Sequence, residues 1–216
     1  METNDQPIFR SDMTVELMQS MGSDESVVAA ARVSTAADHS KEALTQDAEQ
    51  SKGLINFLLK NRHGTPFEHN SFTFFVQAPI FVFREFMRHR IGFSYNEESG
   101  RYRELRPIFY IAAKDRNLVQ QGKPGAYDFV PGSKEQYKTL TTASKAAYIA
   151  SYDAYKTMLQ AGIAREVARQ VLPVGLYSSM YVTCNARSLM SFLSLRTKRP
   201  DSHFPSYPQR EIEMVA

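Results

Sequence analysis

Apolar residues recur every three or four positions through the whole of 133–160, which predicts one long amphipathic helix. The residues that share this spacing are Tyr137, Leu140, Ala143, Ala147, Ala150, Ala154 and Met158. Alanines at so many of these positions favour close packing of the helix, either within the subunit or against a partner. Any fold proposed for this chain must accommodate that helix.

The rest of the chain mixes helical and strand patterns. Phe72, Phe74 and Val76 alternate as on one face of a strand, and Gly64 with Pro66 ends the helix before it. Helices are expected over about 25–33, 48–62, 80–89, 164–172 and 186–195, strands over 13–18, 71–77 and 176–183, and turns or irregular chain over 92–100 and 107–132. No regular βαβ alternation appears, so we expect an α+β fold with helices packed on a central, largely antiparallel sheet, in a single domain over residues 1–216.

Length and composition exclude several classes of protein. The 216 residues suffice for one domain with a sizeable core, and no apolar run approaches the roughly 18–20 residues that span a membrane. The N-terminus lacks the basic and apolar regions of a secretory signal. A single cysteine, Cys184, excludes an internal disulfide framework, and His63 with His69 lacks a third ligand, so no metal site is expected. We expect a cytoplasmic globular protein without a membrane partner.

The net charge of +3 says little about partners, but the distribution of arginine says more. Six arginines lie within one short stretch: Arg84, Arg88, Arg90, Arg101, Arg103 and Arg106. Such clustering is typical of a site for an anionic ligand. The alternative is a solvated face paired with Glu85, Glu97, Glu98 and Glu104.

The segment 88–102 combines these arginines with a polar loop that contains glycine. Arginine forks bind phosphate in a bidentate manner, and Ser, Asn and backbone N–H groups can complete the site. Glu97 and Glu98 suit a ligand that also carries hydroxyl or ring N–H groups, as a nucleotide does. A second group of arginines follows at Arg165, Arg169, Arg187 and Arg196. The glycine patterns of dinucleotide-binding folds, P-loops and serine hydrolases are absent from the sequence.

The stretch Arg88-His89-Arg90 followed by Ser99-Gly100-Arg101-Tyr102 resembles the signature of the flavin-dependent thymidylate synthases. The resemblance continues through 63–69, 78–81, 168–173, 185–190 and 195–196, and so covers nearly the whole chain. Two departures stand out. Eight residues separate Arg90 from Ser99 where the family usually has seven, and Glu85 and Ser191 stand where many members have Gln and Asn. Residues Glu211–Ala216 are expected to begin a helix, and members of the family commonly continue beyond this point.

The resemblance implies a homotetramer of mixed helix-and-sheet subunits with active sites between subunits. Such an enzyme converts dUMP to dTMP with FAD, NADPH and methylenetetrahydrofolate. By motif position, the residues implied to contact FAD are Thr65, Arg88, His89, Arg90, Glu97, Asn185, Arg187 and Ser191. Those implied to contact dUMP are Glu85, Arg88, Glu98, Ser99, Gly100, Arg101, Arg169 and Arg196.

Arg196 and His63 are the expected catalytic residues. A permanently cationic guanidinium at the uracil edge stabilises negative charge as C5 becomes nucleophilic, and Arg196 occupies the family's position for that role. His63 is expected near the folate or the reacting carbon, while Arg101 and Arg169 suit the phosphate.

Two potential nucleophiles are expected to play other parts. Ser99 has no His or Lys base beside it in the sequence, which favours a hydrogen-bond donor to phosphate. The flavin-free thymidylate synthases use a cysteine, but a lone cysteine such as Cys184 in an apolar strand is most often a small packed side chain.

Three functions therefore remain open. The first is flavin-dependent methylation of dUMP, and the second is the same chemistry on UMP, alone or together with dUMP, in a nucleoside-modification pathway. The third, a basic nucleic-acid-binding module, predicts affinity that falls steeply with salt and no bound chromophore. The chain lacks the alternating aromatic platforms of RNA readers, which disfavours a nucleic-acid partner.

Overall fold

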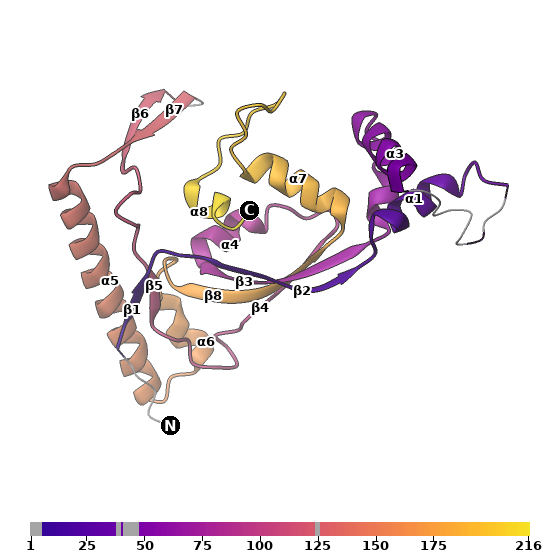
Figure 1. Ribbon diagram of the computed structural model, residues 1–216. Helices are drawn as coiled ribbons and strands as arrows, with labels where there is room; N and C mark the ends of the chain where they lie inside the picture. The colour runs from indigo at the N-terminus through magenta and orange to yellow at the C-terminus, as the bar shows by residue number, and fades with distance from the viewer. Residues whose placement is uncertain (1–5, 38–39, 41–47, 124–125) are drawn as a thin grey trace. The chain divides into compact units, whose positions relative to one another are not determined.

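The computed structural model describes residues 6–37, 40, 48–123 and 126–216, and Figure 1 shows its helices and strands. The chain forms two compact units, each assembled from segments that are distant in sequence. Unit 1 comprises Met1–Asp12, Ala78–Phe83 and Glu98–Ser178, and unit 2 comprises Met13–Gln77, Arg84–Glu97 and Ser179–Ala216.

A four-stranded sheet in the order β2-β3-β8-β4 forms the centre of unit 2. Its strands are β2 (Thr14–Met21), β3 (Ser71–Pro79), β4 (Phe93–Glu97) and β8 (Tyr177–Cys184). β2 pairs antiparallel with β3, and β4 pairs antiparallel with β8. The three strands predicted from sequence are confirmed with small shifts in their ends, and so is the α+β class with its largely antiparallel central sheet.

Helices of unit 2 bury one face each, as their apolar spacing requires. Val27, Leu58 and Phe67 form a small core between three of these elements, and Phe86 stacks on Phe192 with ring centroids 4.5 Å apart. The helical elements are α1 (Asp24–Arg32), α3 (Ala48–Lys60), η1 (Thr65–Glu68), the end of α4 (Ile80–Phe86), α7 (Ala186–Arg196) and α8 (Arg210–Glu213).

Unit 1 is built around α5 (Lys134–Gln160), the long helix of Figure 1. Phe109, Tyr152, Tyr155 and Leu176 form its core. The other elements are β1 (Ile8–Arg10), which pairs parallel with β5 (Ile108–Tyr110), the hairpin of β6 (Val119–Lys123) and β7 (Ala126–Val130), then α6 (Arg165–Ala168) and η2 (Arg169–Val171).

The long helix is confirmed, but its alanines do not pack inside the chain. Ser133 caps α5 by accepting a hydrogen bond from the Gln136 N–H at 3.2 Å, as helix N-termini favour. Tyrosines supply most of the buried face, whereas Ala143, Ala147, Ala150 and Ala154 are exposed. Packing of the alanines within the subunit is therefore wrong, and packing against a second subunit stays a prediction.

Three segments expected to be turns or irregular chain are strands. Phe93 and Tyr95 alternate with polar residues, and this pattern suffices for β4 because β8 supplies a hydrogen-bonded neighbour. β5 and the β6–β7 hairpin lie within 107–132, which was expected to be irregular. Distant partner strands decide β4 and β5, whereas β6 and β7 pair with each other, so turn formers in the sequence did not indicate irregular chain here.

Two predicted helices are shorter than expected. α4 ends at Phe86, where the Tyr95 hydroxyl reaches the carbonyl of Phe86 at 3.0 Å and also that of His89. The segment 164–172 divides into α6 and the 3-10 turn η2, a common way to tighten a helix end before proline. No helix in the described ranges has the length and apolarity needed to cross a bilayer.

Candidate active site

Arg196, the last residue of α7, is held by two side chains of unit 2. Its Nε donates to Nε2 of His89 at 3.0 Å, and one terminal nitrogen donates to the Glu85 carboxylate at 3.2 Å. The other terminal nitrogen lies 3.5 Å from the Glu85 carbonyl. Only 20% of the Arg196 side chain is exposed. The predicted catalytic arginine therefore has a fixed orientation.

The His89 ring is itself fixed by aromatic neighbours. It packs edge-on against Phe192, with centroids 4.9 Å apart, and lies 6.1 Å from the ring of Phe93. Phe192 precedes Arg196 by one turn of α7, so the same helix supplies both contacts to His89. Tyr95 reaches the His89 carbonyl from β4.

Burial and charge shift the titration of this cluster. Desolvation lowers the pKa of His89, and the positive charge of Arg196 lowers it further. Desolvation raises the pKa of Glu85, although Arg196 acts in the opposite direction and Glu211 adds to the rise. Arginine stays charged at any working pH, so the cluster pairs a permanent cation with a histidine biased toward neutrality.

A tight turn fixes the end of the Arg88-His89-Arg90 segment. Gly92 has φ of +70°, and a Cβ there would lie 2.1 Å from Oγ of Ser188. That hydroxyl donates to the Ile91 carbonyl at 2.9 Å. The Asn185 side chain caps α7 by accepting from the Ser188 N–H at 2.9 Å. The predicted cofactor residue Asn185 thus also holds α7 next to this turn.

A second cation–carboxylate pair lies at the start of α7 in unit 2. Arg187 donates to Glu68 at 2.5 Å. Its side chain also lies against Gly64, where an added Cβ would be only 2.7 Å from the Arg187 Nε. Thr65 begins η1 beside this glycine. The ring of His63 packs edge-on to Phe57 at 5.8 Å and is exposed, as a residue that meets a substrate must be.

The remaining predicted cofactor residues also belong to unit 2. Arg88 and Arg90 are exposed, and neither side chain has an ionic partner among the residues that the structure describes. Ser191 is exposed on α7, and Glu97 ends β4 opposite Met180. Two unpaired guanidinium groups in one short segment suit a phosphate-bearing ligand.

The predicted phosphate residues of unit 1 form one loop with Arg169. The Ser99 hydroxyl accepts the Arg101 N–H at 3.2 Å, which leaves its own proton available for a ligand. A Cβ on Gly100 would lie 3.1 Å from Cδ of Arg169 and 2.9 Å from the Leu105 side chain. Gly100 is therefore needed for the close approach of Arg169. No described His or Lys bonds to Ser99, in keeping with a donor rather than a nucleophile.

Carboxylates compete for the cations of this loop. Arg101 donates to Glu166 at 2.9 Å, with both side chains 54% exposed, and Arg103 lies 3.7 Å from Glu98. The end of the loop is fixed more firmly. The hydroxyls of Tyr152 and Tyr155 bond to the carbonyl and the N–H of Leu105, each at 3.2 Å.

Cys184 is a packed side chain, as predicted. It is 3% exposed, and burial raises the pKa of its thiol to about 11. A nucleophilic cysteine needs a lowered pKa and access to substrate. Among the residues that the structure describes, no group of three or more His, Cys, Asp or Glu side chains is placed to hold a metal ion.

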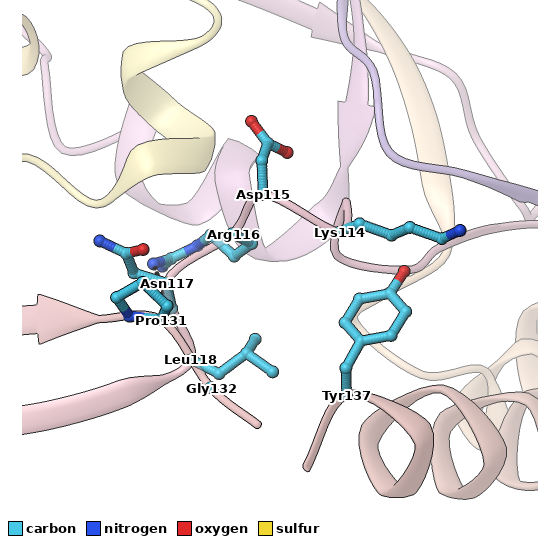
Figure 2. A pocket seen from close by; sticks show the side chains of 8 residues that line it. All are labelled: Lys114, Asp115, Arg116, Asn117, Leu118, Pro131, Gly132 and Tyr137. Atoms are coloured by element: carbon cyan, nitrogen blue, oxygen red, sulfur yellow. Dashed lines mark hydrogen bonds between the residues drawn. The ribbon is translucent and has the colours of Figure 1, made fainter. Parts of the chain in front are cut away.

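A separate cavity of about 110 Å³ lies in unit 1 beside the β6–β7 hairpin (Figure 2). Its lining residues are Lys114, Asp115, Arg116, Asn117, Leu118, Pro131, Gly132 and Tyr137, none of which belongs to the predicted site. Tyr137 bonds to the Ala112 carbonyl, and Arg116 lies over the Phe129 ring. Only the second contact involves the hairpin, because Phe129 belongs to β7.

Sequence reasoning missed the carboxylates that hold the site's cations. Glu166 and Glu68 are separated from their arginines by 65 and 119 residues, and neither lies in a charge pattern that indicates its partner. It also missed Tyr95, whose alternation with Phe93 on β4 was a usable signal.

Comparison with known proteins agrees with these motifs. The family model for "Thymidylate synthase complementing protein" matches residues 16–216. A flavin-dependent thymidylate synthase of Streptomyces coelicolor is 64% identical over 207 residues, which cover 96% of this chain and 84% of the relative. One of Streptomyces avermitilis is 62% identical over 209 residues, which cover 97% of this chain and 85% of the relative. One of Tropheryma whipplei (strain TW08/27) is 58% identical over 211 residues, covering 97% and 87%.

Solved structures give the same result for the fold. The UMP/dUMP methylase PolB of Streptomyces cacaoi, bound with 5-Br dUMP, superposes with a TM-score of 0.89 at 54% identity, covering 96% of this chain and 88% of that one. Its structure bound with 5-Br UMP gives a TM-score of 0.87 at 52% identity, covering 97% and 87%.

Proposed function

The chain belongs to the family of flavin-dependent thymidylate synthases, and we propose that it methylates C5 of dUMP to give dTMP. It is a methyltransferase with FAD as cofactor, and it uses methylenetetrahydrofolate as carbon donor and NADPH as reductant. The observation that carries the choice of chemistry is the orientation of Arg196. Two of its five N–H groups have no partner in the described part of the chain and are available to a uracil oxygen.

Residues of unit 2 fit the flavin cofactor. Arg88 and Arg90 are exposed and have no ionic partner in the described part of the chain. Gly64 has no Cβ, which lets the Arg187 side chain lie against its backbone. Bound FAD would supply the hydride that completes the methyl group. We assign its binding to Thr65, Arg88, Arg90, Glu97, Asn185, Arg187 and Ser191.

Residues of unit 1 suit the phosphate of the nucleotide. Arg169 is exposed and has no described ionic partner, and Gly100 lets it approach the loop closely. Ser99 keeps a hydroxyl proton to donate, and Arg101 lies next to Ser99, in an exposed pair with Glu166 for which a phosphate would compete. We therefore assign Glu98, Ser99, Gly100, Arg101 and Arg169 to the nucleotide.

The chemistry of Arg196 follows from its surroundings. Attack by C5 on the one-carbon donor requires negative charge to develop on the uracil oxygens, and a fixed, mostly buried guanidinium stabilises that charge more than water does. Arg196 stays protonated throughout and so acts by its charge and its hydrogen bonds. His63, exposed beside Gly64, is assigned to the reacting carbon or the folate.

A variant of Arg196 tests this assignment. Arg196→Ala should keep FAD, since its contacts are to His89 and Glu85, but should lose most product formation. Arg199→Ala, three residues further on and exposed, is the matched control and should behave as the unmodified protein. Unchanged turnover in Arg196→Ala would remove this residue from the catalytic machinery.

UMP is the second candidate substrate, because PolB is a UMP/dUMP methylase and was solved with analogues of both nucleotides. A competition assay with equal dUMP and UMP, in the presence of FAD, NADPH and methylenetetrahydrofolate, separates the two by product mass. Only dTMP supports a thymidylate synthase, and a comparable yield of 5-methyl-UMP supports nucleoside modification. A folded protein that binds no flavin and forms no product would overturn both.

We further propose that the chain works as a homotetramer in the cytoplasm. Exposed alanines along α5 and exposed Val15, Leu17 and Met21 of β2 favour burial against further copies. Light scattering after gel filtration measures the assembly. A monomer that turns over at the full rate would contradict an active site shared between subunits.

A further inference from the structure

Arg196 owes its orientation to His89 and Glu85, for which the family resemblance implies only contacts with FAD and dUMP. We propose that Glu85 and a neutral His89 are positioning residues that fix the Arg196 guanidinium, and that protonation of His89 releases it. The inference rests on the proposed function for the role of Arg196. It goes beyond that function because it gives His89 a task other than contact with the cofactor.

The direction of the hydrogen bond determines the protonation state of His89. A guanidinium carries only donors, so the Nε2 atom that lies 3.0 Å from Nε of Arg196 must offer a lone pair. The ring proton is then on Nδ1. A second proton would turn Nε2 into a donor facing a donor, and two cations would meet at hydrogen-bonding distance.

The ring cannot avoid this conflict by rotating freely. Phe192 packs edge-on at 4.9 Å and the ring of Phe93 lies 6.1 Å away, while Tyr95 bonds to the His89 carbonyl. Phe192 and Arg196 share α7 and lie four residues apart, on one face of the helix. The helix that places the guanidinium therefore also places its acceptor.

Of the charged groups around His89, Arg196 favours the neutral form of the ring. Arg196 faces it from α7, and Glu85 of α4 accepts from a terminal nitrogen of the same guanidinium. Glu211 of α8 acts on Glu85, and Tyr95 of β4 contacts the His89 carbonyl. Burial and Arg196 both lower the pKa of His89 from its ordinary value of 6.5. Near neutral pH the ring is uncharged and the acceptor is present.

Three changes at position 89 test the role in the flavin-loaded full chain. His89→Ala removes the acceptor and should lower kcat about ten- to hundredfold at every pH, with flavin content kept. His89→Gln offers an amide oxygen near the place of Nε2 and should restore much of the rate. Protonation of His89 should make kcat of the unmodified protein fall at acidic pH, which is the acidic limb of its pH profile. An amide does not titrate, so His89→Gln should remove this limb. His203→Gln, an exposed histidine of the same unit, should retain that limb.

A measurement without turnover keeps the two proposals separable. The 15N shifts of the labelled histidines report which ring nitrogen carries the proton, and the sequence has five histidines to assign. His89 should show the Nδ1–H form and titrate below 6.5. Arg196→Ala should raise its pKa, because a neighbouring cation is removed, whereas Arg199→Ala should not.

Each outcome is decisive for one proposal. An Nε2–H or charged His89 at neutral pH overturns the positioning role, even if dTMP is formed. The role is also overturned if His89→Ala loses flavin and activity together while His89→Gln shows the same loss. If the labelled ring behaves as expected but the unmodified protein methylates neither nucleotide, the contact stands and the proposed function fails.

Discussion

Replacing Gly92 with alanine perturbs the turn that ends the Arg88-His89-Arg90 segment. An L residue in the left-handed region costs about 1–2 kcal/mol, and Gly92 has φ of +70°. The new Cβ would lie 2.1 Å from Oγ of Ser188, so that hydroxyl must leave its bond to the Ile91 carbonyl. Loss of such a bond costs about 0.5–1.5 kcal/mol. The free energy of unfolding should therefore fall by about 1.5–3.5 kcal/mol.

Two matched variants separate the backbone cost from the side-chain clash. Gly162 has φ of +79° but no atom within 4 Å of its Cβ position, so Gly162→Ala should cost only the backbone component of about 1–2 kcal/mol. Ser188→Ala should cost about 1 kcal/mol by itself and almost nothing when added to Gly92→Ala, since that hydroxyl is already displaced.

Urea unfolding of flavin-free protein, followed by circular dichroism, measures all four variants. The flavin retained per chain, read by absorbance, should fall in Gly92→Ala and not in Gly162→Ala, because Gly92 lies in the turn that follows Arg88 and Arg90 and Gly162 does not. Equal losses of stability in the two glycine variants would refute the reasoning. So would a cost for Ser188→Ala that is the same in both backgrounds.

Three further changes have outcomes that the contacts fix. Glu166→Gln removes the charge that competes with a phosphate for Arg101. The Kd for dUMP should therefore fall by up to about fivefold, and by less at high salt. Titration calorimetry measures this Kd, and Glu104→Gln is the control that should leave it unchanged. Cys184→Ala should leave turnover unchanged. In the unmodified protein, the Cys184 thiol should react only slowly with a disulfide reagent until the pH nears its pKa of about 11, because the reactive thiolate forms only as the pH rises. Asn185→Ala removes the side-chain cap of α7 and should lower the unfolding free energy by about 0.5–2 kcal/mol in urea.

The strands that the sequence predicted are those with a complete local signal. Phe72, Phe74 and Val76 alternate without interruption, and β3 follows them. β4 was missed because Gly92, Asn96 and the acidic residues around it resemble a turn, while the partner strand that stabilises it lies far along the chain. β1 and β5 pair across about 100 residues in three-residue strands, too short for any period to be visible.

The site divides in the same way. Arginines that cluster around glycine in the sequence are the basis of the predicted site residues, and in the structure Gly100 lies next to Arg169, which the sequence did not indicate. Partners of those arginines could not be predicted, because a single glutamate on a helix carries no local sign of the cation that it meets. His89 was assigned to a ligand by its motif, and only the folded chain reveals its bond to Arg196.

The anchoring of Arg196 has a thermodynamic consequence. A long arginine side chain carries about 2 kcal/mol of rotamer entropy, and here most of that freedom is lost when the chain folds rather than when a ligand arrives. The nucleotide thus meets a guanidinium that is already ordered, which strengthens binding at the expense of the stability of the empty protein. Replacing both partners together, Arg196→Met with Glu85→Leu, would fill similar space without leaving a carboxylate unpaired, and such an inactive protein should unfold at a higher urea concentration than the active one.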